Sequence, residues 1–423
     1  MLQKEEINSY NKRHETVHQR SLDFLSEKLA HQGVDIEGII NKTRYFQVAV
    51  PSWALGTGGT RFGRFSGGGE PGSLEEKIAD VGLLHALTAS CNAISLHIPW
   101  DIPQDAGAVK ALAAKHGLLF DAVNSNTFQD QSGQGQSYKY GSLSHTSAIV
   151  RQLAIDHNKE VIDHGMALGS KALTVWLSDG SCFPGQQNFR KALSRTLESL
   201  QQIYKHLPSD WKIFIEYKPY EPNFYSTVIQ DWGTSSFLAN QLGEKAFTLV
   251  DLGHHLPNTN IEQIVATLMM QQKLGGFHFN DSKFGDDDLT TGSIKPYQLF
   301  LIFNELVEGM TSGDPEPAWM IDASHNVKDP LEDLMQSLEA IRIAYVQALL
   351  VDRVTLHEAQ EANDAVSAQN ILQDAFRTDV RAIVAEARRV DGGALDPIGV
   401  FRAMDIRKQL IGQRGEKAIA TGL

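Results

Sequence analysis

The chain has 423 residues, 42% hydrophobic and 8% aromatic, with 51 acidic against 38 basic side chains and a formal net charge of −13. This composition is that of a globular protein with a packed core and excludes a largely disordered chain. The negative charge would repel phosphate backbones, so we expect no nucleic acid partner. The first residues are charged throughout and no apolar run is long enough to span a membrane, which predicts a cytoplasmic protein with no membrane partner.

Eight short apolar runs of strand length alternate with longer stretches of helical spacing. The runs are FQVAV (46–50), AISLHI (93–98), LLFDAV (118–123), ALTVWL (172–177), IFIEY (213–217), AFTLVDL (246–252), GGFHFN (275–280) and PAWMID (317–322). Helices are expected at 73–88, 147–168, 187–206, 260–273 and 296–308. Ser73 with Glu76 forms a capping-box pattern, and Gly169 ends the second of these helices. Repeated strand–helix units in this number favour a closed (β/α)8 TIM barrel over an open doubly wound sheet.

The ends of the chain differ from this alternation. Residues 1–30 look helical, and residues 330–423 have helical spacing with little strand character. We therefore expect a catalytic barrel domain at 1–329 with an N-terminal helical lead, and a C-terminal helical extension at 330–423 that makes oligomer contacts. The segments after the strands are long, polar and rich in glycine, as is typical of the catalytic face of such a barrel.

Ionisable residues stand at the ends of four successive predicted strands. Glu216 ends the fifth strand, Asp251 the sixth, His278 the seventh and Asp322 the eighth, and His254 follows Asp251 by three residues. Unpaired carboxylates that converge on one barrel rim would repel one another and shift one another's pKa. A divalent cation removes that conflict, so the pattern predicts a metal site.

The loop after His278 contains GDDDL, in which Asp286 and Asp288 can turn toward one ion while Asp287 points away. The stretch lacks the twelve-residue ligand pattern of an EF-hand loop. Mixed carboxylate and imidazole ligands suit Mn²⁺, Co²⁺ or Mg²⁺ better than a closed structural zinc site. The number of ligand candidates is sufficient for two ions.

Two further polar residues are candidates for the same rim. Lys218 shares a strand face with Glu216, because alternate residues of a strand point the same way. It is either a surface lysine or a fixed positive charge that stabilises an oxyanion beside the metals. His97, which ends the second strand, is either a core histidine or a hydrogen-bonding and acid–base group of the pocket.

Aromatic residues follow or end three other strands: Trp53, Phe128 and Trp176. Each alone would belong to the core, but together around polar centres they suit the apolar faces of sugars. The glycine-rich stretch LGTGGTRFGRFSGGGEPG (55–72) fits neither GxGxxG nor GxxxxGK, so phosphate binding is only weakly supported. We expect it to be a mobile or intersubunit loop that carries Phe62.

Nine blocks, in order between about residues 35 and 410, resemble the bacterial L-rhamnose isomerases of broad aldose specificity. These proteins are relatives of xylose isomerase with a metal-dependent (β/α)8 barrel. The blocks are AVPSWALGTGGTRFGRF, SLHIPWD, NSNTF, SYKYGSLSHT, KALTVWLSDGS, EYKPYEP, VDLGHHLPNTNIE, GGFHFNDSKFGDDDL and MIDASHN.

The resemblance implies a role for each candidate residue. A structural ion would be held by Glu216, Asp251, His278 and Asp322, and a catalytic ion by the bridging Asp251 with His254, Asp286 and Asp288. The implied catalytic residues are Lys218 beside the sugar O1, His97 near the ring oxygen, and Asp322. The implied substrate-binding residues are Trp53, Phe128, Trp176 and Ser324, with Phe62 from the adjacent subunit of a homotetramer. Two ions per subunit are implied, with Mn²⁺ expected and Co²⁺, Mg²⁺ or Zn²⁺ as alternatives.

The reaction implied by the resemblance is isomerisation of L-rhamnose to L-rhamnulose by a metal-assisted 1,2-hydride shift, with activity on other aldoses such as D-allose. Another aldose as the main substrate stays open. A metal-dependent hydrolase or nuclease on the same barrel is a rival interpretation, which the negative charge and the placement of Lys218 disfavour. A sugar-binding protein without catalysis is a second rival, which the full set of ligand candidates disfavours.

Overall fold

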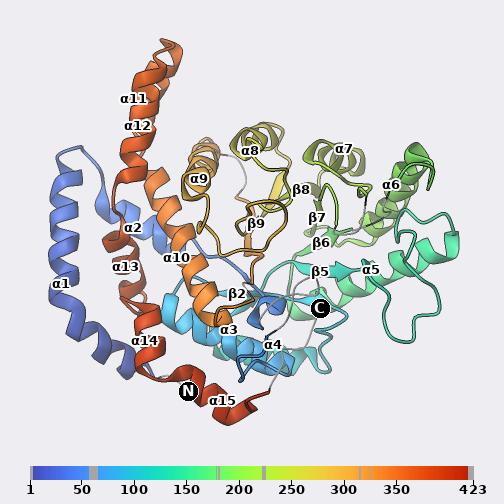
Figure 1. The fold of residues 1–423 in the computed structure, drawn as a ribbon, viewed down its shortest axis with the longest axis horizontal. Helices are drawn as coiled ribbons and strands as arrows, with labels where there is room; N and C mark the ends of the chain where they lie inside the picture. Colours follow the sequence, from blue (N-terminus) through green and yellow to red (C-terminus); the bar gives the residue numbers. More distant parts are fainter. Residues whose placement is uncertain are drawn as a thin grey trace.

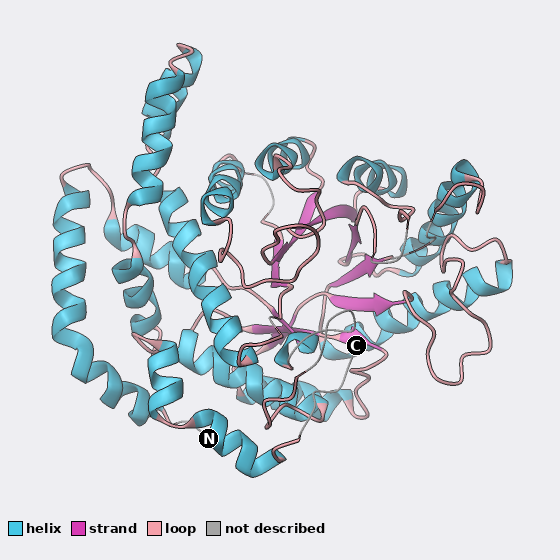
Figure 2. Cartoon of the chain, viewed as in Figure 1, coloured by secondary structure: helices cyan, strands magenta, loops and turns pink. Residues whose placement is uncertain are grey.

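The computed structural model describes residues 3–56, 65–177, 179, 182–221, 225–313, 316–324 and 326–417. Parallel strands occupy the centre of the molecule and helices surround them (Figure 1 and Figure 2). The strands are β1 (Val50–Pro51), β2 (Ala93–Ser95), β3 (His97–Ile98), β4 (Leu119–Phe120), β5 (Val123–Asn126), β6 (Ala172–Trp176), β7 (Lys212–Glu216), β8 (Ala246–Asp251), β9 (Leu274–Phe279) and β10 (Ala318–Ile321). Each of the eight apolar runs contains or borders a strand, so the sequence located the sheet correctly.

The strands form a barrel of eight positions, because the second and third positions are each divided into two short strands. The order β10-β9-β8-β7-β6-β5-β3 makes one sheet and β1-β2-β4 the other. All of these pairings are parallel. A parallel bridge from Ala49 to Met320 joins the first strand position to β10. The expected (β/α)8 architecture is confirmed.

The helices that cover the barrel are α3 (Leu74–Thr88), α4 (Ala106–Lys115), α5 (Ala148–Leu168), α6 (Phe189–His206), α7 (Trp232–Leu242), α8 (Ile261–Met270), α9 (Pro296–Thr311) and α10 (Pro330–Leu349). The five expected helices are present, with α8 three residues shorter at its C-terminal end than predicted. The Ser73 hydroxyl accepts the Glu76 N–H at 3.3 Å, and Gly169 ends α5 with φ +95°. The predicted start of α3 and the predicted end of α5 are therefore confirmed.

The remaining helices lie outside this ring, except for the 3₁₀ helix η1 (Ser52–Leu55), which is buried directly after β1. They are α1 (Lys4–Ala30), α2 (Ile36–Tyr45), α11 (Arg353–Glu361), α12 (Ala365–Arg377), α13 (Arg381–Val390), α14 (Pro397–Ala403) and α15 (Ile406–Arg414). In Figure 1, α11 and α12 project away from the barrel, whereas α13 runs beside α1 and α2. The division at residue 329 and the oligomer contacts stay predictions. In the described part of the chain no single helix suits a membrane span, though α10 and α11 together, bent by 67°, have the length and composition for one.

The interior of the barrel is closed at one level by a small apolar cluster. Its buried members are Ala122, Ala172, Phe214 and Leu249. Since side chains alternate along a strand, residues two positions further on point into the barrel as well. Glu216 follows Phe214 in this way, and Asp251 follows Leu249. The polar rim is therefore built directly above an apolar plug, at the carboxyl ends of the strands.

Candidate metal centre

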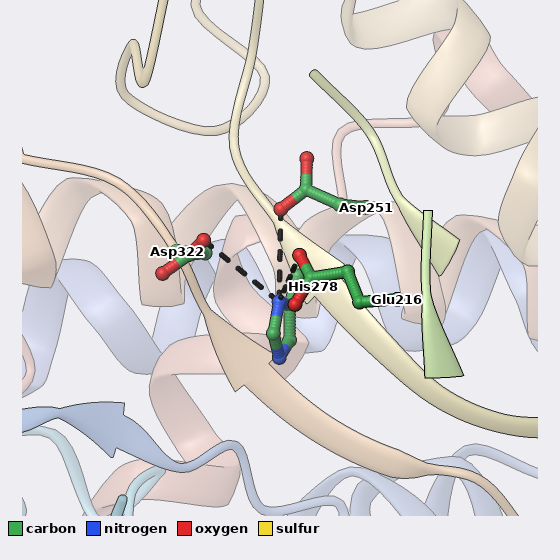
Figure 3. A group of neighbouring side chains, drawn as sticks. All are labelled: Glu216, Asp251, His278 and Asp322. Atoms are coloured by element: carbon green, nitrogen blue, oxygen red, sulfur yellow. Dashed lines mark hydrogen bonds and ion pairs between the residues drawn. The ribbon is translucent and has the colours of Figure 1, made fainter. Parts of the chain in front are cut away.

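Four side chains from successive strands meet at the rim: Glu216, Asp251, His278 and Asp322. One potential ligand atom from each lies within 4.8 Å of the others, and only Asp322 is less than fully buried. His278 Nδ1 lies 3.2 Å from Glu216 Oε1, 3.7 Å from Asp251 Oδ2 and 3.8 Å from Asp322 Oδ2. Figure 3 shows the three carboxylates around this one nitrogen. The strand ends thus supply a complete set of mixed oxygen and nitrogen donors.

A second group contains Asp251, His254 and Asp286, again within 4.8 Å of one another. His254 Nε2 lies 3.4 Å from Asp286 Oδ2 and 4.0 Å from Asp251 Oδ1. Asp251 therefore belongs to both groups, with Oδ2 toward His278 and Oδ1 toward His254.

The two groups bring together six of the seven ligand candidates, and Asp288 is the exception. Asp288 is buried and has a left-handed backbone with φ +46°, and its carbonyl accepts the Ser324 N–H at 3.2 Å. Asp287 accepts the N–H groups of Lys283 at 2.7 Å and Phe284 at 3.0 Å, so it faces its own turn as expected. The role of Asp288 as a ligand stays a prediction.

The imidazoles of the rim are strongly affected by the carboxylates around them. Burial alone would lower the pKa of His278, but Glu216 and Asp251 outweigh it and raise that pKa well above its usual range. Burial would likewise lower the pKa of His254, and Asp251 with Asp286 raises it to about 9. Burial raises the pKa of Asp322 to about 7. In the metal-free protein, protonated imidazoles supply positive charge that the carboxylates need.

The donor set fits a divalent cation. Asp251 Oδ2 is fully buried, and no described residue donates a hydrogen bond to it. A buried carboxylate oxygen without a donor is costly unless a positive charge faces it. Carboxylate and imidazole ligands together suit divalent ions of intermediate hardness, whose charge would replace the protons on His254 and His278.

Two supporting residues were not predicted from the sequence. Asn280 donates from Nδ2 to Asp251 Oδ1 at 2.9 Å and to the Asp322 carbonyl at 3.2 Å. Gly253 donates its N–H to Asp251 Oδ1 at 2.7 Å, and a Cβ at this glycine would lie 2.6 Å from Asp286 Oδ1. Asn280 shares the strand face of His278, so the alternation rule could have found it. Nothing in the sequence pattern marks Gly253.

Lys218 is buried at this rim. Its Nζ donates to Asp286 Oδ2 at 2.5 Å and to Glu221 Oε1, and it lies 5.3 Å from the ring centre of Trp176. The lysine is therefore not a surface residue. Glu221 is a buried partner that the sequence analysis missed. It lies only three residues after Lys218 in EYKPYE, and this short spacing could have indicated the ion pair.

His97 lies on β3, pairs in register with Asn124 and is buried. Burial lowers the pKa of its ring to about 3, so the imidazole is neutral at any physiological pH. Its backbone N–H donates to Asp101 Oδ2 at 2.9 Å, and its Nδ1 lies 3.4 Å from Ser52 Oγ. A neutral histidine presents one donor and one acceptor nitrogen, which suits hydrogen bonding to a sugar hydroxyl.

Four of the five expected substrate-binding residues lie in the described part of the chain. The Trp53 indole N–H donates to Asp322 Oδ1 at 2.8 Å, which ties this ring to the first ligand group. Phe128 and Trp176 are in edge contact, with ring centres 4.8 Å apart. Ser324 is buried and its hydroxyl donates to the Gly56 carbonyl at 2.8 Å. Phe62 lies outside the described residues.

Two curated proteins match this chain over nearly its whole length. A probable sugar isomerase of Rhizobium meliloti is 54% identical over 405 residues, which are 95% of this chain and 94% of the relative. A probable sugar isomerase of Mesorhizobium japonicum is 53% identical over 398 residues, 94% of this chain and 92% of the relative. The chain belongs to this family of sugar isomerases. A sugar isomerase takes a small sugar as its substrate, and the polar rim with its aromatic neighbours is the candidate place to bind it.

The sugar isomerase chain also has a counterpart among solved structures. A D-allulose 3-epimerase from Methylomonas sp. superposes with a TM-score of 0.50 at 14% identity, covering 70% of this chain and 98% of the epimerase. At this identity the similarity concerns the fold, and it agrees with the barrel described above. No protein-family model matches the chain.

Proposed function

We propose that this sugar isomerase is a metal-dependent aldose–ketose isomerase that converts L-rhamnose to L-rhamnulose and also accepts other aldoses such as D-allose. The observation that carries the proposal is the pair of ligand groups that share Asp251, next to the buried charge of Lys218. An aldose and its ketose differ by the position of two hydrogens at C1 and C2. A site for this reaction needs positive charge at two neighbouring oxygens, which divalent ions held by the two adjoining ligand groups would provide.

In this proposal one ion is held by Glu216, Asp251, His278 and Asp322, and the other by Asp251, His254, Asp286 and Asp288. Bound divalent ions, with Mn²⁺ expected, would supply Lewis-acid polarisation of the sugar oxygens. The chain's own residues fix these ligands before the sugar arrives. Asn280 orients Asp251, and hydrogen bonds of this kind between ligands and their neighbours raise metal affinity.

Lys218 is proposed to stabilise the negative charge that develops on the sugar oxygen at C1. A fixed ammonium in a buried place stabilises such a charge more than a solvated one does, because little solvent screens it. Glu221 and Asp286 hold the ammonium from two sides, and Trp176 packs against it. Lys218 would thus be preorganised rather than recruited during the reaction.

The pocket walls are proposed to be Trp53, Phe128, Trp176 and Ser324, with Phe62 contributed by a neighbouring subunit. Aromatic rings cover the C–H faces of a sugar and exclude water from the hydrogen that moves between C1 and C2. His97 would form a hydrogen bond with a sugar hydroxyl.

The first experiment is ketose formation from L-rhamnose by protein stripped with a chelator, assayed with and without added Mn²⁺. We expect L-rhamnulose only when Mn²⁺ is added. Ketose from a different aldose, with none from L-rhamnose, would move the main substrate to that aldose. Absence of ketose from every aldose tested, with every divalent ion tested, would refute the proposed reaction.

The route of the hydrogen is tested in deuterated water. A 1,2-hydride shift carries the hydrogen directly from C2 to C1, so the product should contain no deuterium on carbon. Deuterium at C1 of the ketose would instead indicate an enediol route with a general base.

A further inference from the structure

A buried ion pair lies beside His97, and neither of its members belongs to a ligand group. Lys77, on the first turn of α3, donates from Nζ to Asp101 Oδ1 at 2.7 Å, and both side chains are 1% exposed. Removing two charges from water costs desolvation energy that their attraction repays only in part. A contribution to stability therefore does not explain why this ion pair is buried here. The other contacts of Asp101 indicate a positioning role.

The second oxygen of Asp101 organises the residues around His97. Asp101 Oδ2 accepts the backbone N–H of His97 at 2.9 Å and the hydroxyl of Ser52. The Asp101 N–H returns to the His97 carbonyl at 3.0 Å, which closes the turn after β3. Because Lys77 donates to Oδ1 of Asp101, Oδ2 is available to accept from both His97 and Ser52.

These contacts determine which nitrogen of His97 carries the proton. The single hydroxyl hydrogen of Ser52 is used on Asp101, so Ser52 Oγ can only accept from His97 Nδ1, 3.4 Å away. His97 must then be the Nδ1–H tautomer, with Nε2 left as an acceptor. An acceptor nitrogen would take a hydrogen bond from a sugar hydroxyl, whereas the other tautomer would donate one.

We propose that Lys77 is a positioning residue, which through Asp101 and Ser52 holds His97 in its Nδ1–H tautomer with Nε2 ready to accept from the sugar. Lys77 itself does not touch the sugar. The catalytic consequence rests on the proposed isomerase function, whereas the tautomer of His97 can be tested without it.

The kinetic test compares Lys77→Met, which keeps the length of the side chain and removes its charge, with Lys77→Arg. For an aldose that the unaltered protein isomerises, we expect Lys77→Met to lower kcat about 10- to 100-fold, with KM and the Mn²⁺ dissociation constant changed less than about twofold. Lys77→Arg should restore most of the loss. Lys115→Met, at an exposed lysine of α4, is the matched control and should change nothing.

A double substitution tests the route of the effect. If Lys77 acts through Asp101, Lys77→Met together with Asp101→Asn should be no slower than Asp101→Asn alone. This double variant leaves no unpaired buried charge, so it can be compared with Asp101→Asn even if Lys77→Met alone does not fold. Fully additive losses in kcat would refute the route through Asp101.

The ring nitrogens of ¹⁵N-histidine-labelled protein give a readout that is independent of activity. His97→Gln assigns the His97 signal, which should show Nδ1–H in the unaltered protein and lose that preference in Lys77→Met. An Nε2–H tautomer in the unaltered protein, or an unchanged tautomer and kcat in Lys77→Met, would overturn the proposal. If no aldose is isomerised, the proposed function fails, and the NMR result still decides the arrangement of His97.

Discussion

At the scale of single residues, Asp251 is the centre of the rim. Its Oδ2 faces His278 and its Oδ1 faces His254. Asn280 and Gly253 both donate hydrogen bonds to Oδ1. A residue shared by two ligand groups couples them, so a change there should affect both sites at once.

Asp251→Asn should therefore abolish binding at both sites. An amide carries no charge and is a weaker metal ligand than a carboxylate. The loss of Mn²⁺ affinity should therefore exceed the roughly 10- to 100-fold loss that follows removal of a residue that hydrogen-bonds to a ligand. Titration calorimetry with Mn²⁺ would measure the number of ions bound. Asp287→Asn, in the same acidic stretch but facing its own turn, is the control. Retention of one full-affinity ion in Asp251→Asn would contradict a shared ligand.

Metal binding should release protons at neutral pH. The pKa of His254 is raised to about 9 and that of Asp322 to about 7, so both hold protons that an ion must displace. Apparent affinity for Mn²⁺ should rise as pH rises toward about 9. The raised His254 pKa also stabilises the metal-free fold fully below about 6.5, a contribution lost as pH rises through about 9. Calorimetry in buffers of different ionisation enthalpy counts the protons, and identical apparent enthalpies would contradict the prediction.

Gly253→Ala should weaken metal binding without unfolding the barrel. The added Cβ would lie 2.6 Å from Asp286 Oδ1 and 3.3 Å from Asp251 Oδ1, which forces the two carboxylates apart. We expect Mn²⁺ affinity to fall about 10- to 100-fold, as when a ligand loses its orienting neighbour. Gly135→Ala has nothing within 4 Å of its Cβ and serves as the comparison. Equal affinity of the two variants would show that the rim tolerates the methyl group.

At the scale of elements, the long loops after the strands are fixed by buried carboxylates. Asp179, after β6, accepts the N–H groups of Ser142 at 2.8 Å and Ser144 at 2.9 Å, and both of their hydroxyls as well. The loop that carries Phe128 is thereby attached to the next strand position. Asp281 similarly accepts the N–H groups of Ile294 and Lys295 at the start of α9.

Asp179→Ala should lower the free energy of unfolding by about 3 kcal/mol, because it leaves buried donors of one loop without a charged acceptor. Urea unfolding followed by circular dichroism would measure the change. Asp156→Ala is a suitable control, since its carboxylate is 59% exposed and lies 3.8 Å from Lys159. A similar stability for both variants would mean that the loop is held by other contacts.

At the scale of the whole molecule, α11 and α12 contact α9 and α10 at their base and project beyond them (Figure 1). Val354 and Val366 on these helices are each 71% exposed. Together with the resemblance to homotetrameric isomerases, this favours contacts between subunits.

The solution mass should therefore be that of a tetramer. Four chains of 46.7 kDa give about 187 kDa. Light scattering after size-exclusion chromatography measures this mass directly. A particle of one chain would contradict the tetramer and would also remove the proposed contribution of Phe62 to a neighbouring pocket.

The sequence by itself determined the barrel and most of its rim. The apolar runs located the strands because a strand buried on both faces is apolar along its length, and strand order in a (β/α)8 barrel follows the chain. Glu216, Asp251, His278 and Asp322 could be placed together because parallel strands end at one face.

Only the tertiary structure decided how the loops contribute. The bridge between Asp281 and Leu289 closes the acidic stretch, and Asp286 of this stretch reaches His254, whereas Asp288, which was expected beside it, lies in neither ligand group. Likewise, Lys77 and Asp101 are 24 residues apart, and only the packing of α3 against the turn after β3 brings them within 2.7 Å. Strands repeat a local geometry that a pattern can reveal, whereas a loop side chain is oriented by distant partners that leave no periodic signal in the sequence.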